Sequence, residues 1–262
     1  MNVFMFHFGR SGSTVLANAI ASIPDFFWHG EIFTGGTVVY DGFEALELSS
    51  KKGGGRFDCS EFLEFIDVAK QGIERQIGHP IMRYGCEIKS FHFEFGYFSF
   101  PLENALEALA SSFPDSRFIF LRRRNSLRRI LSATIARQTG IYHIKTVVDK
   151  PNRIQIDLDA FEDADLNFRG EITAVLRNSM AVENRYAEAI LKHGGFEICY
   201  EDHIEASLEP AMTILSQQLD VECVVPETQL RKTNPFPLSE TIENYEELWQ
   251  RLSVAGMDNF LL

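Results

Sequence analysis

An apolar run at the start of this 262-residue chain leads into a short loop at residues 8–15, with the sequence Phe-Gly-Arg-Ser-Gly-Ser-Thr-Val. A helical pattern follows directly. Gly9 and Gly12 let the backbone approach a ligand closely because they carry no Cβ. Backbone N–H groups at a helix start carry partial positive charge and point into such a loop. The segment therefore predicts a strand, an anion-binding loop and a helix. The simpler interpretation is an ordinary strand-to-helix turn with Ser13 as N-cap.

The loop differs from the Walker A sequence, which has four residues between its glycines and a Lys before the hydroxyl residue. Here two residues separate Gly9 from Gly12, and no Lys follows. Arg10 is then the fixed cation of the loop. Its planar guanidinium binds oxyanions through two parallel hydrogen bonds, which suits a phosphosulfate as well as a phosphate.

Apolar periodicity predicts strands and helices that alternate along the chain. The predicted strands cover residues 2–8, 81–90, 117–121 and 196–200, and the predicted helices cover about 15–23, 62–73, 102–113, 127–135, 171–192 and 204–219. Such alternation indicates the α/β class, with a central parallel sheet flanked by helices. We expect a single domain over 1–262. Residues 139–168 lack sustained periodicity and are predicted to form a long substrate-facing loop with one strand at 154–158.

The composition limits the classes of function. A formal net charge of −12 argues against a general nucleic-acid binder, because contact with the phosphate backbone needs a basic face. Hydrophobic residues make up 45% of the chain and include 23 Phe, enough for a sizeable core without disulfides.

The cysteines show no metal-ligand spacing and are expected to be structural thiols in a reducing compartment; they are Cys59, Cys86, Cys199 and Cys223. The first residues lack the charged start of a signal peptide, and no apolar run of about 18 residues follows. We therefore expect a cytoplasmic protein without an integral membrane segment.

A second group of cations follows the predicted strand at 117–121. Arg122, Arg123 and Arg124 lead into a helix for which Asn125 or Ser126 is the predicted N-cap. Arginine at a helix N-terminus opposes the macrodipole, and a bound dianion offsets that cost. In parallel sheets, ligands bind beyond the carboxyl ends of the strands, where the first loop and these arginines would both lie. At least one of the three is expected to be a surface charge.

These segments resemble sulfotransferases that use 3′-phosphoadenosine 5′-phosphosulfate (PAPS), especially bacterial carbohydrate enzymes that sulfate Nod factors, lipopolysaccharide or trehalose. The loop from Gly9 to Thr14 is similar to the family's 5′-phosphosulfate loop in its arginine form. Residues 113–125 are similar to the 3′-phosphate motif, in which an Arg precedes a Ser by eight residues, as Arg124 precedes Ser132. Both motifs occur in the family's order, each at a strand-to-helix junction.

Weaker similarities extend the resemblance over most of the chain. Tyr200-Glu201-Asp202 is similar to a strand end common in these enzymes, and Arg231-Lys232 is similar to a late basic pair, although Thr233 stands where the family has Gly. The resemblance implies a fold like that of P-loop NTPases. It also implies these donor-binding residues: Gly9, Arg10, Ser11, Gly12, Ser13, Thr14, Arg124, Ser132, Arg231 and Lys232.

The resemblance implies Glu31 as the catalytic base, with Arg10 as the second catalytic residue. Glu31 lies among aromatic residues in 26–33, where desolvation raises the proton affinity of a carboxylate; most Glu side chains are simply exposed. His29 and His143 are the alternatives. Lys89, at a predicted strand end, is a candidate contact of the leaving phosphate or the acceptor.

The implied reaction transfers a sulfuryl group from PAPS to an acceptor hydroxyl, with no metal required because Arg10 and the loop amides neutralise the leaving group. A sugar or glycolipid acceptor suits an acidic protein with aromatic loops. Two alternatives remain open. A P-loop kinase-like transferase normally needs the P-loop Lys that is missing here, and a noncatalytic nucleotide-binding module would have no use for a base. The acceptor and the oligomeric state are not determined.

Overall fold

The computed structural model describes residues 1–33, 56–142, 149–222, 225–226 and 235–261. Contacts divide the chain into two compact units: Met1–Arg122 with Arg185–Pro226, and Arg123–Asn184 with Glu227–Leu262. The single domain over 1–262 stays a prediction.

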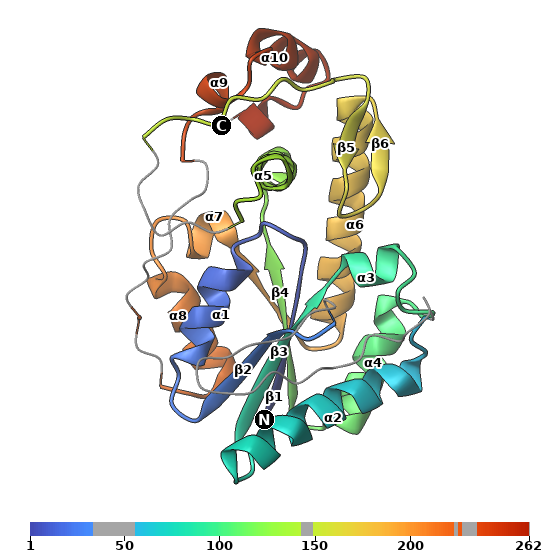
Figure 1. Ribbon diagram of the computed structural model, residues 1–262, viewed down its shortest axis with the longest axis vertical. Helices are drawn as coiled ribbons and strands as arrows, with labels where there is room; N and C mark the ends of the chain where they lie inside the picture. Colours follow the sequence, from blue (N-terminus) through green and yellow to red (C-terminus); the bar gives the residue numbers. More distant parts are fainter. Residues whose placement is uncertain (34–55, 143–148, 223–224, 227–234, 262) are drawn as a thin grey trace. The chain divides into compact units, whose positions relative to one another are not determined.

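A parallel sheet forms the centre of the first unit (Figure 1). Within the described residues it has five strands in the order β2-β3-β1-β4-β7, and every neighbouring pair is parallel. The strands are β1 (Asn2–His7), β2 (Phe26–Glu31), β3 (Arg83–Lys89), β4 (Ser116–Arg122) and β7 (Phe196–Cys199). The predicted α/β class is confirmed, and so are the strands predicted over 2–8, 81–90, 117–121 and 196–200. β2 is a strand that the periodicity did not predict.

The central strand β1 is buried on both faces, because its side chains alternate between two apolar layers. Val3 and Met5 belong to a core cluster formed with residues of α1 and α8, while Phe4 and Phe6 contact the ring of Phe118. Figure 1 shows α1 and α8 on one side of the sheet and α2 and α4 on the other. The helices of this unit are α1 (Ser13–Ala21), α2 (Cys59–Ile77), α3 (Phe91–Glu94), α4 (Leu102–Ser112), α7 (Tyr200–His203) and α8 (Glu209–Leu219), and α6 (Ile172–Lys192) ends in it.

Local signals explain where these helices begin and end. Asp58 caps α2 in a capping box with Glu61, and Gly78 ends the helix in the left-handed conformation. The predicted helix over 204–219 begins later, at Glu209. Pro210 occupies its first turn, where the missing N–H costs nothing and the fixed φ favours a helix start.

The second unit has its own apolar core of residues from α5 and α10 with the first turns of α6. Its elements are α5 (Ser126–Thr139), the antiparallel hairpin of β5 (Phe161–Asp163) and β6 (Phe168–Gly170), the start of α6, α9 (Leu238–Thr241), α10 (Tyr245–Val254) and the 3₁₀ helix η1 (Asp258–Leu261). Asn125 is the N-cap of α5, as predicted, and its side chain accepts a hydrogen bond from Arg128 N.

The strand predicted at 154–158 is wrong. Ile154 forms one isolated bridge with Ile242, and the Asn244 side chain takes the place of the next backbone partner. Its Oδ1 accepts from Ile156 N at 3.0 Å and its Nδ2 donates to Ile156 O at 2.8 Å. The alternating isoleucines are buried as in a strand. The apolar alternation therefore predicted the burial of these residues correctly. It did not predict the strand, because the Asn244 side chain, and not a second strand, forms hydrogen bonds with the backbone of Ile156.

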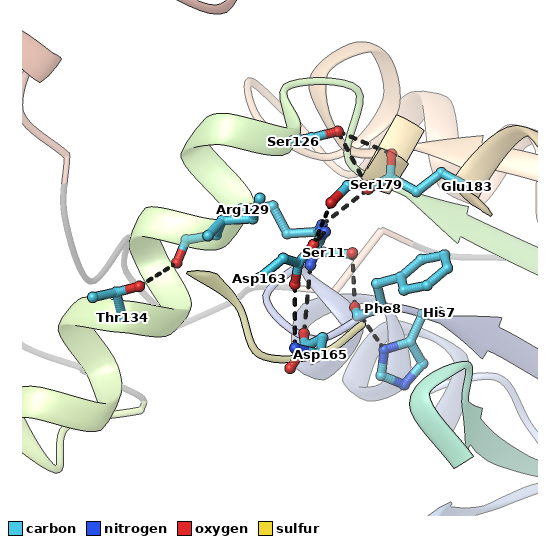
Figure 2. A network of polar contacts seen from close by, with 11 residues as sticks. His7, Phe8, Ser11, Ser126, Arg129, Thr134, Asp163, Asp165, Ser179 and Glu183 are labelled. Atoms are coloured by element: carbon cyan, nitrogen blue, oxygen red, sulfur yellow. Dashed lines mark hydrogen bonds and ion pairs between the residues drawn. The ribbon is translucent and has the colours of Figure 1, made fainter. Parts of the chain in front are cut away.

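A network around the buried Arg129 links α5, β5 and α6 in the second unit (Figure 2). Its Nη2 lies 2.5 Å from Asp163 Oδ2 and its Nε lies 3.0 Å from Glu183 Oε1. The hydroxyls of Ser179 and Ser126 donate to the same two carboxylates. Burial opposes the charge on Arg129, but the carboxylates outweigh it and raise its pKa. The network is charge-paired and hydrogen-bonded, as a buried ion must be.

We predict that Arg129→Met lowers the free energy of unfolding by about 3–5 kcal/mol, because it leaves two buried carboxylates without their cation. Urea unfolding of both proteins measures the loss. The control is Arg251→Met. Arg251 pairs with the exposed Asp159, and surface ion pairs contribute little to stability because water screens them. Equal losses in the two variants would contradict the assignment.

The cysteines within the described ranges are free thiols at positions 59, 86 and 199. Burial, with the charge of Glu87, raises the pKa of Cys86 well above its ordinary value. Cys223 lies outside the described residues. Across the described ranges, none of the helices has the length and apolar character needed to span a bilayer.

Candidate active site

The loop after β1 turns sharply, so that α1 starts at the edge of the sheet formed by the carboxyl ends of the strands, the carboxyl edge. Arg10 and Gly12 have φ angles of 65° and 90°. Ser11 is fully buried and its Oγ donates to Phe8 O at 2.8 Å (Figure 2). Gly12 is the N-cap of α1, so Ser13, the N-cap in the simpler interpretation, is instead the first residue of the helix. Gly12 provides no side-chain cap for α1, and a helix N-terminus without such a cap is suited to an anion.

Arg10 adopts the left-handed conformation that a residue with a Cβ rarely takes. Such conformations cost of the order of 1 kcal/mol and cluster at binding sites, where the surrounding structure maintains them. The turn therefore fits a loop shaped for a ligand better than a simple strand-to-helix connection.

Tyr200, at the start of α7, packs against the loop. A Cβ at Gly12 would lie 2.7 Å from Tyr200 Cδ2, so no larger residue fits while the ring stays in place. Of the segment Tyr200-Glu201-Asp202, Tyr200 contacts the loop directly. This contact gives both Gly12 and Tyr200 a packing role.

The strand registers bring charged side chains from three neighbouring strands to this edge. His7 is in register with Lys89, two positions beyond Glu87 on β3. In β2 the register shifts between Trp28 and Glu31, and Gly30 lies there with a φ of 65°. This irregularity is a β-bulge: it inserts one residue and sets Glu31 opposite Glu87.

The charged groups are paired. Lys89 Nζ lies 2.5 Å from Glu31 Oε2, and both side chains are partly exposed. Behind them, His7 Nε2 lies 3.1 Å from Glu87 Oε2, and Trp28 Nε1 donates to Glu87 Oε1 at 3.0 Å. Burial alone raises the pKa of Glu87, but His7 and Trp28 outweigh it and hold the pKa below its ordinary value.

One donor atom from each of His7, Glu31 and Glu87 lies within 4.8 Å of the other two. A divalent cation would fit this donor set poorly. It would have to displace the Lys89 ammonium from Glu31, and it would need an unprotonated Nε2 on His7. That the reaction needs no metal stays a prediction.

The predicted site residues fall into groups. Gly9 to Thr14 and Glu31 lie in the first unit at the carboxyl edge, and Ser13 also hydrogen-bonds Glu87. Arg124 immediately precedes the N-cap of α5 and Ser132 lies within that helix, both in the second unit. Arg231, Lys232 and the alternative base His143 lie outside the described residues.

The alternative base His29 is buried and lies 2.8 Å from the Tyr84 hydroxyl through Nδ1. Burial lowers its pKa to about 4, so it is neutral at physiological pH. Lys89, a candidate contact of donor or acceptor, instead pairs with Glu31 in this structure.

Sequence reasoning missed His7, Glu87 and Trp28. A signal was present, because Glu87 is a charged residue inside an otherwise apolar strand, and a buried carboxylate requires partners. The partners themselves come from β1 and β2, and periodicity does not pair strands.

No family model matches this chain, and no curated protein matches it. Among solved structures, it is similar to the "Crystal Structure of Sulfotransferase from Alicyclobacillus acidocaldarius", with a TM-score of 0.48 and 14% identity, over 99% of this chain and 95% of that chain. A likeness of this size assigns no activity to the chain.

We predict that Gly12→Ala lowers the free energy of unfolding by about 2–4 kcal/mol, because positive φ and the clash with Tyr200 act together. Gly78→Ala is the matched control, since Gly78 has a φ of 78° but nothing within 4 Å of the added Cβ. It should cost about 1–2 kcal/mol. In a Tyr200→Ala background the extra cost at Gly12 should disappear. Urea unfolding of the four variants measures these values, and an unchanged cost would contradict the contact.

Proposed function

We propose that this protein is a sulfotransferase that moves the sulfuryl group of PAPS to a hydroxyl of a carbohydrate or glycolipid. One observation carries the proposal: the loop after β1 and the Glu31–Lys89 pair on β2 and β3 lie at the same edge of one parallel sheet. The loop after β1 supports the binding of an anionic donor. The Glu31–Lys89 pair supports a carboxylate base beside that donor.

In the proposed reaction, an oxygen lone pair of the acceptor hydroxyl attacks the sulfur of PAPS. The bond between sulfur and the 5′-phosphate oxygen breaks, and its electron pair stays on the phosphate, giving adenosine 3′,5′-bisphosphate. The hydroxyl proton passes to the Glu31 carboxylate, and the acceptor becomes a sulfate ester. Arg10 and the N–H groups of the first turn of α1 stabilise the charge on the leaving phosphate. Glu31 then releases its proton to solvent, to which it is partly exposed.

The 3′-phosphate is assigned to Arg124, which lies just before α5, and to Ser132 within that helix, from their spacing. Arg231 and Lys232 are proposed as further contacts of this phosphate. Arg10 in place of the P-loop lysine favours the sulfuryl donor over the phosphoryl donor of a kinase.

We predict that Arg124→Ala weakens the binding of adenosine 3′,5′-bisphosphate by about 10–100-fold, the worth of one charge-assisted contact. Titration calorimetry measures the affinity. Arg137→Ala is the control, because Arg137 is exposed in the last turn of α5. ATP and GDP serve as competing ligands in thermal-shift assays. Unchanged affinity in Arg124→Ala would remove this residue from the site, and preferential stabilisation by ATP would favour the kinase-like alternative.

We predict that Glu31→Gln retains nucleotide affinity while kcat falls about 10²–10⁴-fold, since general base catalysis contributes this much. Transfer of radiolabelled sulfate from PAPS to a panel of glycans and glycolipids measures kcat. Glu64→Gln, on the exposed surface of α2, is the control. Full turnover in Glu31→Gln would exclude it as the base. Nucleotide binding by the wild-type protein without transfer to any acceptor would indicate a noncatalytic binding module.

A further inference from the structure

In the proposed reaction Glu31 is the base and Lys89 is its ion-pair partner. The neighbouring buried residues His7 and Glu87 have no role in that reaction. Both are buried, His7 completely and Glu87 at 5% exposure. We refer to them as the His7–Glu87 pair. A buried histidine and carboxylate in contact are expensive to desolvate, and a fold retains such a pair only when the surrounding groups satisfy it.

Hydrogen-bond chemistry locates the protons of this pair. His7 Nδ1 lies 3.1 Å from Phe8 O, and a carbonyl oxygen only accepts, so Nδ1 carries a hydrogen (Figure 2). Nε2 faces Glu87 Oε2 at 3.1 Å. Glu87 is held as a carboxylate by donors on its other side, of which Trp28 Nε1 is one. The 3.1 Å contact between Nε2 and Glu87 Oε2 is an ion-pair distance without hydrogen-bond alignment, and the negative charge of Glu87 favours the ring form in which Nε2 also carries a hydrogen. That form is the imidazolium.

The charges alternate from the interior to the surface: Glu87, His7, Glu31 and Lys89 are negative, positive, negative and positive. The distances support this order, because a donor atom of Glu31 lies within 4.8 Å of both His7 and Glu87. Without the imidazolium, two carboxylates would face each other at this separation. One of them would then bind a proton more readily.

The titratable groups facing His7 within the described residues come from three elements. Glu87 and Lys89 come from β3, Glu31 comes from β2 and His92 comes from α3. Burial, together with the charges of Lys89 and His7, lowers the pKa of His92 to about 3. His92 is therefore neutral and leaves His7 as the buried cation of the group.

We propose that His7 is a positioning residue for the transfer reaction: Glu87 holds it as an imidazolium, and its charge keeps the Glu31 carboxylate ionised and oriented to receive the acceptor proton. The inference rests on the proposed function only in naming Glu31 as the base. The protonation of His7 and its effect on Glu31 are properties of the resting protein.

The first test needs neither a variant nor a substrate. Long-range ¹H–¹⁵N spectra of the full chain labelled with ¹⁵N-histidine, assigned through the backbone, report the state of each ring at pH 7.5. We expect both nitrogens of His7 to carry hydrogen, and His29 and His92 to be neutral. An unprotonated Nε2 on His7 overturns the proposal. So does a selective change of the His7 signals on adding Mg²⁺ or Zn²⁺, which would indicate a cation site.

The second test compares His7→Asn with His29→Asn, a matched loss of a buried but neutral histidine. In a ¹³C-carboxyl titration, the Glu31 midpoint should move to higher pH by about one unit in His7→Asn, since loss of a neighbouring cation favours the protonated acid. His29→Asn should leave it unchanged. The acid limb of the kcat–pH profile should move together with the Glu31 midpoint, so that kcat on that limb falls about tenfold in His7→Asn. At high pH kcat should be near normal, and KM for the donor should be unchanged.

An unmoved Glu31 midpoint, or an equal loss of kcat at every pH, shows a purely structural role and overturns the proposal. Absence of sulfuryl transfer by the wild-type protein is a separate result. It refutes the proposed function, while the two NMR measurements still decide whether His7 is the counter-charge of Glu31.

Discussion

The parallel register of β1, β2 and β3 is the constraint on which the candidate site depends. In a parallel sheet all carboxyl ends meet at one edge, so charged residues that end separate strands are forced together. Here the edge collects His7, Glu31, Glu87 and Lys89. Taken out of water, each charge needs a partner. The resulting pairs leave one carboxylate near solvent, held by an ammonium.

The loop after β1 depends on the same edge. β1 lies at the centre of the sheet, so the turn after it is supported by neighbouring strands on both sides. Tyr200 closes over Gly12 from the end of β7, and Ser13 reaches Glu87 from the start of α1. The loop and the charged cluster are therefore connected, since Gly12 contacts Tyr200 and the neighbouring Ser13 contacts Glu87. The second unit also contains a buried charge that needs partners. There Arg129 pairs with carboxylates from β5 and α6.

Local patterns predicted most of the elements, because amphipathic periodicity reports burial and burial accompanies regular structure in most segments. α2, α4, α6 and the strands around β1 follow this rule. The failures have local causes that periodicity does not include. Asn244 replaced a strand partner beside Ile156, and Pro210 delayed the start of α8. Phe26 to Glu31 follow α1 so closely that their strand was not recognised.

The sequence by itself determined the α/β class, the loop after the first strand and the candidacy of Arg10, Glu31 and Arg124, because each depends on residues close together in the chain. Only the tertiary structure decided the partners of those residues. Glu31 meets Lys89 and faces Glu87 through a one-residue bulge, and His7 lies 3.1 Å from Glu87 because Glu87 is on the neighbouring strand. Pairing of strands and burial of charge are long-range effects: they depend on which segments meet, and no local pattern contains that information.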